Sequence, residues 1–301
     1  MKKNNIIAIA AIALTFTACS NDNDFTTNNE GKDTPISLSV GVGELSVVTR
    51  AENTATLTDG ELGLYITKNG EKTLQGKYLC NNAQFTYNDG WSCTNTYYWA
   101  ADNATIDYVA YHPYLSTVTG NYISWNVTDQ RNVNRDLLYQ NASDVTNPTD
   151  HSIAITLGHV CSKLVVNVSK LGSEIAFGTT ISSIKIGGLK PKGTFNLTDG
   201  TWDSSNETAA DIEMAALVTP NQGMKATCEA ILIPQEAAFT LTIRLNNNSE
   251  YQLAVPSHAF AAGTCYTLTI QVGQDKVNLG SITQTDWVPG NSGDDNHLTA
   301  Q

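Results

Sequence analysis

The chain has 301 residues, a formal net charge of −12, 41% hydrophobic residues and 15% charged residues. This length is enough for one large or two modest domains, and abundant Gly, Thr and Asn favour strands and turns over solvated helices. The acidic balance and the lack of a Lys/Arg run argue against nucleic acid as a partner.

Residues 1–19 have the features of an export signal, with Lys2 and Lys3 before an apolar core that is too short to span a membrane. Cys19 directly follows Phe-Thr-Ala and resembles a bacterial lipobox, in which the Cys thiol carries diacylglycerol. Phe16 stands where the usual pattern has Leu. We therefore expect an exported lipoprotein anchored through Cys19, with plain secretion as the alternative.

Residues 20–34 are polar and predict a disordered tether. The next segment, residues 36–42, alternates apolar residues with Ser, Ser and Gly, which predicts an isolated strand. Its apolar residues are Ile36, Leu38, Val40 and Val42. A lone Arg50 followed by Ala51 lies in a small-residue context. We assign residues 20–50 to this tether and N-terminal strand.

From about residue 57 onward, short strand-like runs are separated by turn residues. The runs of the first half are 62–67, 84–87, 106–111 and 122–127. Residues 136–150, which end in Asn-Pro-Thr-Asp, predict a loop between two halves. The runs of the second half are 163–169, 181–186, 193–197, 230–233, 239–245 and 266–272.

The last strand signals are Val277, Leu279 and Ile282, with Trp287 just beyond. No window shows a helical apolar spacing over a dozen residues. The pattern predicts an all-β chain of two tandem β-sandwich domains, residues 51–155 and 156–288, and a polar flexible tail at 289–301.

Five cysteines remain besides Cys19, an odd number that cannot form a complete disulfide framework. They are Cys80, Cys93, Cys161, Cys228 and Cys265. Cys80 and Cys93 could pair across a hairpin, but burial as small apolar residues is the expectation for most of the five. His159-Val160-Cys161 lacks a second ligand pair at a metal-binding spacing, so we predict core packing and no metal.

No nucleophile elbow, phosphate-binding loop or zinc-protease motif is present, so we expect no enzyme activity and no cofactor. Four tryptophans could stack on sugar rings, but core packing is the expected role for aromatic residues in strand-like runs. They are Trp91, Trp99, Trp125 and Trp202.

Several stretches, in order from about residue 97 to 287, together resemble the fimbrillin family, the subunits of type V pili on Gram-negative anaerobes. The stretches are Tyr97-Tyr98-Trp99, Ile106-Asp107-Tyr108-Val109-Ala110-Tyr111-His112-Pro113, Asp136-Leu137-Leu138-Tyr139, Ile155-Thr156-Leu157-Gly158-His159 with Ser162-Lys163-Leu164, Gly193-Thr194-Phe195-Asn196-Leu197 with Gly200-Thr201-Trp202, Ile231-Leu232-Ile233-Pro234-Gln235, and Phe260-Ala261-Ala262-Gly263 with Tyr266-Thr267-Leu268, ending at Ile282 and Trp287.

The resemblance implies two transthyretin-like β-sandwich domains and a lipidated precursor carried to the outer membrane surface. In that family an Arg-specific protease cuts after an Arg, and the matching bond here is Arg50–Ala51. The cut removes the first strand, residues 36–42 here, and opens a hydrophobic groove. A donor strand from the C-terminal region of a neighbouring subunit then fills the groove.

The resemblance therefore implies other pilus subunits as partners, in a homo- or hetero-polymer. The polar residues 288–301 make a poor donor, so the candidate donor residues are Val277, Leu279, Ile282 and Trp287, which could instead form the sandwich's own last strand. The alternative function is a pilus-tip or monomeric surface adhesin that binds glycan or a host protein.

Overall fold

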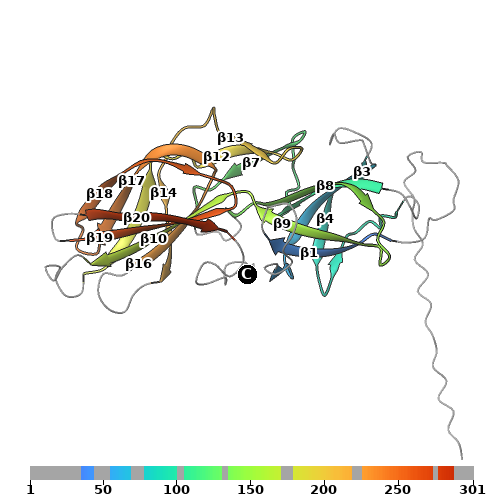
Figure 1. The fold of residues 1–301 in the computed structure, drawn as a ribbon, viewed down its shortest axis with the longest axis horizontal. Helices are drawn as coiled ribbons and strands as arrows, with labels where there is room; N and C mark the ends of the chain where they lie inside the picture. The colour runs from blue at the N-terminus through green and yellow to red at the C-terminus, as the bar shows by residue number, and fades with distance from the viewer. Residues whose placement is uncertain are drawn as a thin grey trace, which may run out of the picture. The chain divides into compact units, whose positions relative to one another are not determined.

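The computed structural model describes residues 35–43, 55–68, 78–99, 105–130, 135–170, 179–218, 226–273 and 277–287. These residues all belong to one compact unit, Gly31–Gln301. The labelled elements of Figure 1 are strands, which confirms the predicted all-β class. Within the described ranges, no helix has the length and apolarity that crossing a membrane requires.

The first sandwich is built from one eight-stranded sheet. Its strand order is β2 (Ala55–Thr56), β1 (Ser37–Gly43), β9 (Ser152–His159), β8 (Leu138–Thr146), β6 (Thr105–His112), β3 (Glu61–Lys68), β4 (Tyr78–Tyr87) and β5 (Trp91–Ser92). β8 and β9 share only two residue pairs. Apolar residues of β1 and β9 pack in one cluster with those of β3, β4 and β6, so the two arms of the sheet enclose a common core.

The predicted loop at residues 136–150 is wrong for Leu138–Thr146, which form β8. The strand begins with the buried Leu138 and Tyr139 and then carries mainly polar residues, several of them exposed. Because only its start lies deep in the core, β8 has too few apolar residues for a period-two signal. Its pairing with β6 along its length outweighs this polar composition.

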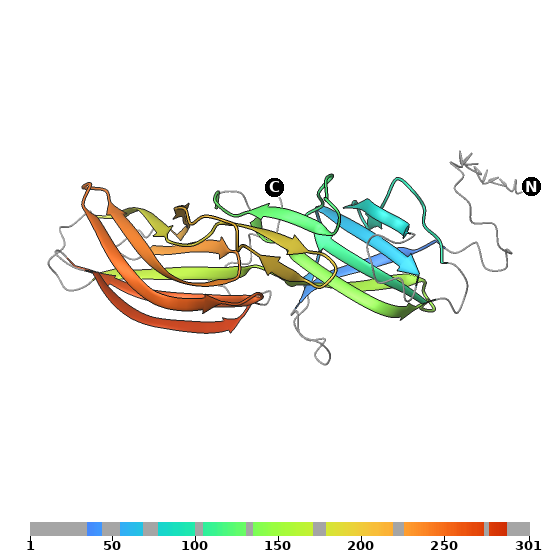
Figure 2. The same cartoon turned by 90° about the horizontal axis from the view of Figure 1, so that it is seen from above.

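The second sandwich has two sheets with one core between them. The five-stranded sheet has the order β15 (Ala215–Val218), β16 (Ala226–Leu232), β10 (Ser162–Lys170), β19 (Thr264–Val272) and β20 (Val277–Asp286). The four-stranded sheet has the order β14 (Ile212–Glu213), β11 (Ile181–Gly187), β17 (Gln235–Leu245) and β18 (Glu250–Phe260). Their long strands, coloured yellow-green to red, have roughly aligned axes in Figure 2, and most neighbours are antiparallel.

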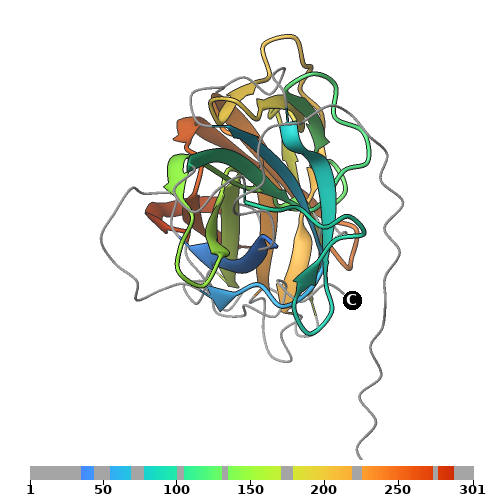
Figure 3. The ribbon, with the colours of Figure 1, turned by 90° about the vertical axis from the view of Figure 1, so that its right-hand side faces the viewer.

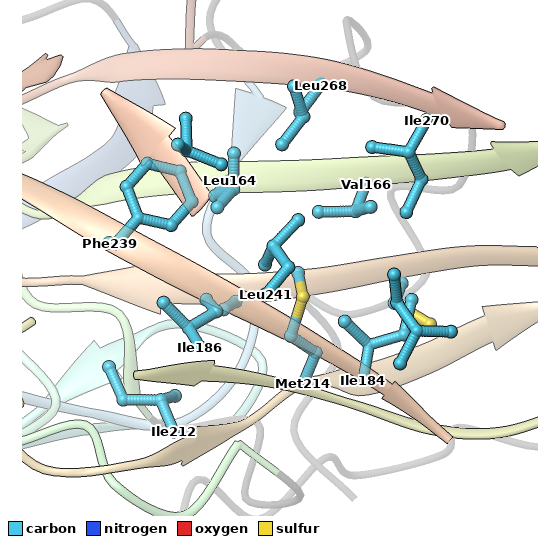
Figure 4. Packing of buried hydrophobic residues seen from close by; sticks show 14 of the residues in the cluster. Leu164, Val166, Ile184, Ile186, Ile212, Met214, Phe239, Leu241, Leu268 and Ile270 are labelled. Atoms are coloured by element: carbon cyan, nitrogen blue, oxygen red, sulfur yellow. The ribbon is translucent and has the colours of Figure 1, made fainter. Parts of the chain in front are cut away.

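Buried and more exposed positions alternate along β17, as expected for a strand with one face on the core. Figure 4 shows side chains of the two sheets meeting in this core, among them Phe239, Leu241, Leu164, Val166, Leu268 and Ile270. The two predicted β-sandwiches are thus confirmed. The predicted domain boundary between residues 155 and 156 stays a prediction. These two residues are consecutive in β9.

A third, three-stranded sheet joins the two halves of the sequence. β7 (Tyr122–Asn126) pairs with β12 (Lys192–Asn196), which also pairs with β13 (Thr201–Asp203). A separate buried cluster includes Trp125 of β7 and Phe195 of β12. The hydroxyl of Tyr139 donates to the carbonyl of Leu197 at 2.8 Å, so strand pairing, packing and hydrogen bonding all link residues of the first and second halves.

Candidate assembly site

The apolar side chains of β1 fill part of the core of the first sandwich. Val40 and Val42 are 2% and 1% exposed. Ile36, directly before the strand, is also buried, and Leu38 is half-buried against the same cluster. The serines between them are exposed. The structure thus places the four predicted apolar residues in one row facing the core.

One edge of β1 pairs with β9 over its whole length. The two strands are parallel, and seven consecutive residue pairs run from Ser37–Ser152 to Gly43–Gly158 without a register shift. In Figures 1 and 3 the blue β1 runs beside the yellow-green β9. β9 is therefore the strand whose edge removal of β1 would expose.

The other edge of β1 is covered near its two ends. At the start, the amide of Ile36 donates to the carbonyl of Tyr97 at 2.8 Å. Toward the end, the amide of Leu57 donates to the carbonyl of Val40 at 3.0 Å, and the short β2 pairs with the next residues. Removal of β1 would leave a groove with backbone groups on both sides, here called the β1 slot.

A single carbonyl fixes the start of β1 to the turn before β9. The His151 oxygen accepts from the Ser37 amide at 3.2 Å and from the indole Nε1 of Trp99 at 3.3 Å. His151 has a positive φ of 56°, and its Nδ1 lies 2.8 Å from Oδ1 of Asn147. This turn therefore holds the first strand in register with its neighbour.

β20, which carries the candidate donor residues, is the last strand of the five-stranded sheet. It pairs antiparallel with β19 from Val272–Val277 to Thr264–Asp286. Val277 and Ile282 are half-buried against the second core, whereas Leu279 is 38% exposed. A register shift separates the pair of Leu279 from the pair of Ile282. β20 is an edge strand with partial burial.

Trp287, directly after β20, is buried and contacts polar side chains. Its ring stacks on His159 with centroids 4.0 Å apart and an interplanar angle of 7°. His159 Nδ1 is 2.6 Å from Oδ2 of Asp136. Nζ of Lys163 lies 5.7 Å from the Trp287 ring centroid and 2.7 Å from the Glu229 carboxylate. The aromatic end of β20 is thus held against the end of β9.

This arrangement was not predicted, although His159 was expected in the core and is 2% exposed. Trp287 and His159 are far apart in sequence, and no short-range spacing connects them. Among the described residues, no group of three or more His, Cys, Asp or Glu side chains is arranged to hold a metal ion.

The five cysteines are free thiols, so the Cys80–Cys93 pairing is not formed. Four are buried, and Cys93 is half-buried. Burial raises the pKa of Cys80 to about 12 and the pKa of Cys228 to about 11. Since the thiolate is the reactive form, both side chains act as packing groups at neutral pH.

The four tryptophans that could stack on sugars all contribute to the interior to some degree. Trp99 is 1% and Trp125 8% exposed, and the other two are half-buried. The indole Nε1 of Trp125 donates to the carbonyl of Arg135 at 2.8 Å. Trp202 donates to the carbonyl of Val160. Cys19, Arg50 and Ala51 lie outside the described residues.

The chain is an all-β protein of two sandwiches, and its first strand contributes to the core of the first sandwich. Comparison with known sequences identifies its family. Residues 49–287 match the family model described as fimbrillin-like. A candidate fimbrium subunit, Fim1C of Bacteroides uniformis, is 27% identical over 315 residues, covering 97% of this chain and 98% of that protein. The chain belongs to the fimbrillin-like family.

Solved structures share the fold. A candidate cell adhesion protein of Bacteroides uniformis has a TM-score of 0.65 at 21% identity, covering 85% of this chain and 98% of that chain. A candidate cell adhesion protein of Bacteroides ovatus has a TM-score of 0.62 at 17% identity, covering 84% and 98%. A fimbrial protein of Bacteroides vulgatus has a TM-score of 0.56 at 17% identity, covering 84% and 99%.

Proposed function

We propose that this chain is a structural subunit of a bacterial surface pilus that supports adhesion. It is exported as a lipoprotein modified at Cys19, reaches the outer membrane surface and is cleaved after Arg50. Loss of β1 then opens the β1 slot, and a donor strand from another pilus subunit fills it. The family membership supports the pilus role, and the seating of β1 supports the exchange.

The observation that carries the proposal is the pairing of β1, with β9 along the whole of one edge and with other segments near both ends of the other edge. A strand there gains main-chain hydrogen bonds on both sides and plugs the core with alternate side chains. Burying each such aliphatic side chain contributes roughly 1.5–3 kcal/mol, so an empty slot strongly favours a replacement strand. The bond after Arg50 lies between β1 and β2 in the sequence, so cutting it detaches β1 while β2 stays with the body.

Cleavage is tested by Arg50→Ala in the producing bacterium, with Arg244→Ala as the control because Arg244 is an exposed arginine on β17. Surface material is run on SDS gels without boiling and probed for this chain. The wild type and Arg244→Ala should appear in high-mass SDS-resistant species, and Arg50→Ala should appear only at monomer mass. High-mass species in Arg50→Ala would refute the cleavage step.

The anchor is tested separately by labelled palmitate. Cys19→Ala should abolish incorporation of the label, and Cys228→Ala, which removes a buried thiol, should leave it unchanged. Full labelling of Cys19→Ala would show that lipid is attached elsewhere.

Val277, Leu279, Ile282 and Trp287 are the proposed residues that this chain donates to a neighbouring subunit. The double variant Val277→Asp with Leu279→Asp should abolish the high-mass SDS-resistant species in which this strand joins two subunits, because charged groups do not enter an apolar groove. Asn278→Asp with Thr285→Asp adds the same charge at exposed positions of β20 and should have little effect. Equal incorporation of both double variants would place the donor elsewhere.

The second candidate function is a monomeric or pilus-tip adhesin that binds a glycan or a host protein. The names of two solved structural relatives, both candidate cell adhesion proteins, favour it. An adhesin that acts as a monomer would stay at monomer mass on the cell surface whether or not Arg50 is present.

A further inference from the structure

We propose that the β1 slot is filled by a strand of a different protein chain, not by the C-terminal strand of a second copy of this chain. The inference rests on the proposed donor-strand function. It concerns which partner fits the slot, and it follows from comparing the side chains that the slot holds with those that this chain can offer.

The slot selects for an unbroken row of four apolar residues. Ile36, Leu38, Val40 and Val42 are spaced by two and pack in a single cluster. The seven pairs with β9 contain no register shift, so an occupant that keeps the same hydrogen bonds must be a straight strand with strict alternation. The exposed Ser37 and Ser39 show that the positions between the first three side chains select little.

β20 cannot supply such a row as a straight strand. In one frame, residues 277, 279, 281 and 283 are Val, Leu, Ser and Thr. In the other frame, residues 278, 280, 282 and 284 are Asn, Gly, Ile and Gln. The better frame has two adjacent apolar residues and would bury the hydroxyls of Ser281 and Thr283 where Val40 and Val42 now lie. Hydroxyl groups moved from water into apolar surroundings without a partner oppose binding.

The same strand fits its own sheet because of its irregularity. The register shift between the pairs Ile270–Leu279 and Leu268–Ile282 brings Ile282 opposite a core residue, although it lies three positions after Leu279 and so outside a strict alternation. At the shift, a Cβ on Gly280 would lie 2.6 Å from the carbonyl oxygen of Thr269. β20 is thus adapted to a bulged pairing with β19, and β9 offers an unshifted edge.

Residues 287–301 supply no substitute. Across residues 277–301, no three positions spaced by two are all apolar. The pairs at this spacing are Val277 with Leu279 and Leu298 with Ala300. Residues 277–301 of a second copy therefore do not match the slot. The occupant that we infer is a strand of another protein, with four aliphatic side chains at alternate positions as in residues 36–42 of this chain.

The test uses the full-length chain, purified in detergent and cleaved after Arg50 with an Arg-specific protease. Three synthetic peptides compete with a fluorescent peptide of residues 35–43 for the cleaved protein, and fluorescence anisotropy gives their affinities. The first is unlabelled 35–43, and the second is 277–287. The third is 277–287 with Ser281→Val and Thr283→Val, which completes a row of four apolar residues and otherwise matches the second peptide.

We expect the first and third peptides to compete at concentrations at least tenfold lower than the second. The cleaved wild-type chain alone should stay a monomer on SDS gels without boiling. Competition by the 277–287 peptide as strong as that of 35–43, or SDS-resistant ladders of the pure wild-type chain, would overturn the inference and leave strand donation intact. Failure of the labelled 35–43 peptide itself to bind would overturn the slot, and with it both proposals.

Discussion

The first and last described strands of this chain, β1 and β20, are built for different environments. β1 has covered edges and places Val40 and Val42 at 1–2% exposure. β20 pairs on one edge only within its sheet and leaves Leu279 38% exposed. An alternating apolar sequence with an unshifted register belongs to the inserted strand, whereas an interrupted sequence with a register shift belongs to the edge strand. Loss of β1 would therefore expose much of the first core, whereas loss of β20 would expose less of the second.

The largest expected effect comes from placing a charge on the buried face of β1. Val40→Asp in the uncleaved chain leaves a carboxylate without a partner in the first core and should lower the free energy of unfolding by about 3–5 kcal/mol. Ser39→Asp, at the exposed neighbouring position, is the control. Urea unfolding followed by tryptophan fluorescence measures both, and similar midpoints for the two variants would contradict the burial of Val40.

A smaller effect is expected at the bulge of β20. Gly280→Val places a side chain against the Thr269 carbonyl, at 2.6 Å from the Cβ position, and should destabilise the β19–β20 pairing by about 1–3 kcal/mol. Ser281→Val, at an exposed position, is the matched control. Hydrogen exchange should accelerate in β19 and β20 for Gly280→Val and stay unchanged in β1 and β9. Acceleration in both pairs of strands would show that the two regions unfold as one.

The third prediction compares truncations to Ala in the two strands. Val42→Ala removes two methyl groups from a fully buried site and should cost about 2 kcal/mol, including the cavity. Leu279→Ala removes more atoms from an exposed site and should change stability by no more than about 0.5 kcal/mol. Thermal or chemical unfolding measures both. A larger loss for Leu279→Ala would mean that β20 covers more of the second core than its exposure indicates.

Regular alternation explains which elements could be predicted. β1, β6 and β10 each carry apolar residues in a strand pattern or an apolar run, and their positions follow from sequence alone. β8 was missed because its polar second part is held by pairing with β6, which is separated from it by β7 in the sequence. Local patterns report on burial, and a strand stabilised chiefly by backbone pairing carries little of that signal.

Long-range partners account for the rest of what could not be predicted. The parallel pairing of Ser37 with Ser152 and the stacking of His159 on Trp287 join residues more than a hundred positions apart. A period-two pattern identifies a strand's buried face but does not name its neighbours. The register shift next to Gly280 likewise depends on the backbone of β19. The apolar residues of β20 could therefore be predicted from the sequence, and their register against β19 could not.

The smallest expected effect is a loss of unfolding free energy at alkaline pH, which one buried thiol in each sandwich reports. Folding keeps the buried thiols protonated, raising the pKa from 9.0 to about 12 for Cys80 in the first core and to about 11 for Cys228 in the second. Above pH 9 the unfolded thiols lose their protons and the folded ones retain them. The contribution of each thiol to the free energy of unfolding is therefore fully present below pH 9. It falls as the pH rises toward the folded pKa, by up to about 1.4 kcal/mol per pH unit.

Urea unfolding between pH 8 and 9.5 tests this loss, because tyrosines, with a pKa of 10.0 in the unfolded chain, contribute little there. Cys80→Ala should flatten the fall with pH in the transition of the first sandwich, and Cys228→Ala should do so in that of the second. Thr86→Ala, at an exposed and non-titrating position of β4, should keep the wild-type slope. Because deletion of a buried side chain also costs stability at every pH, the slope and not the midpoint decides the outcome. A Cys80→Ala slope parallel to the wild type would show that this thiol is not shielded from water by the core to which β1 contributes.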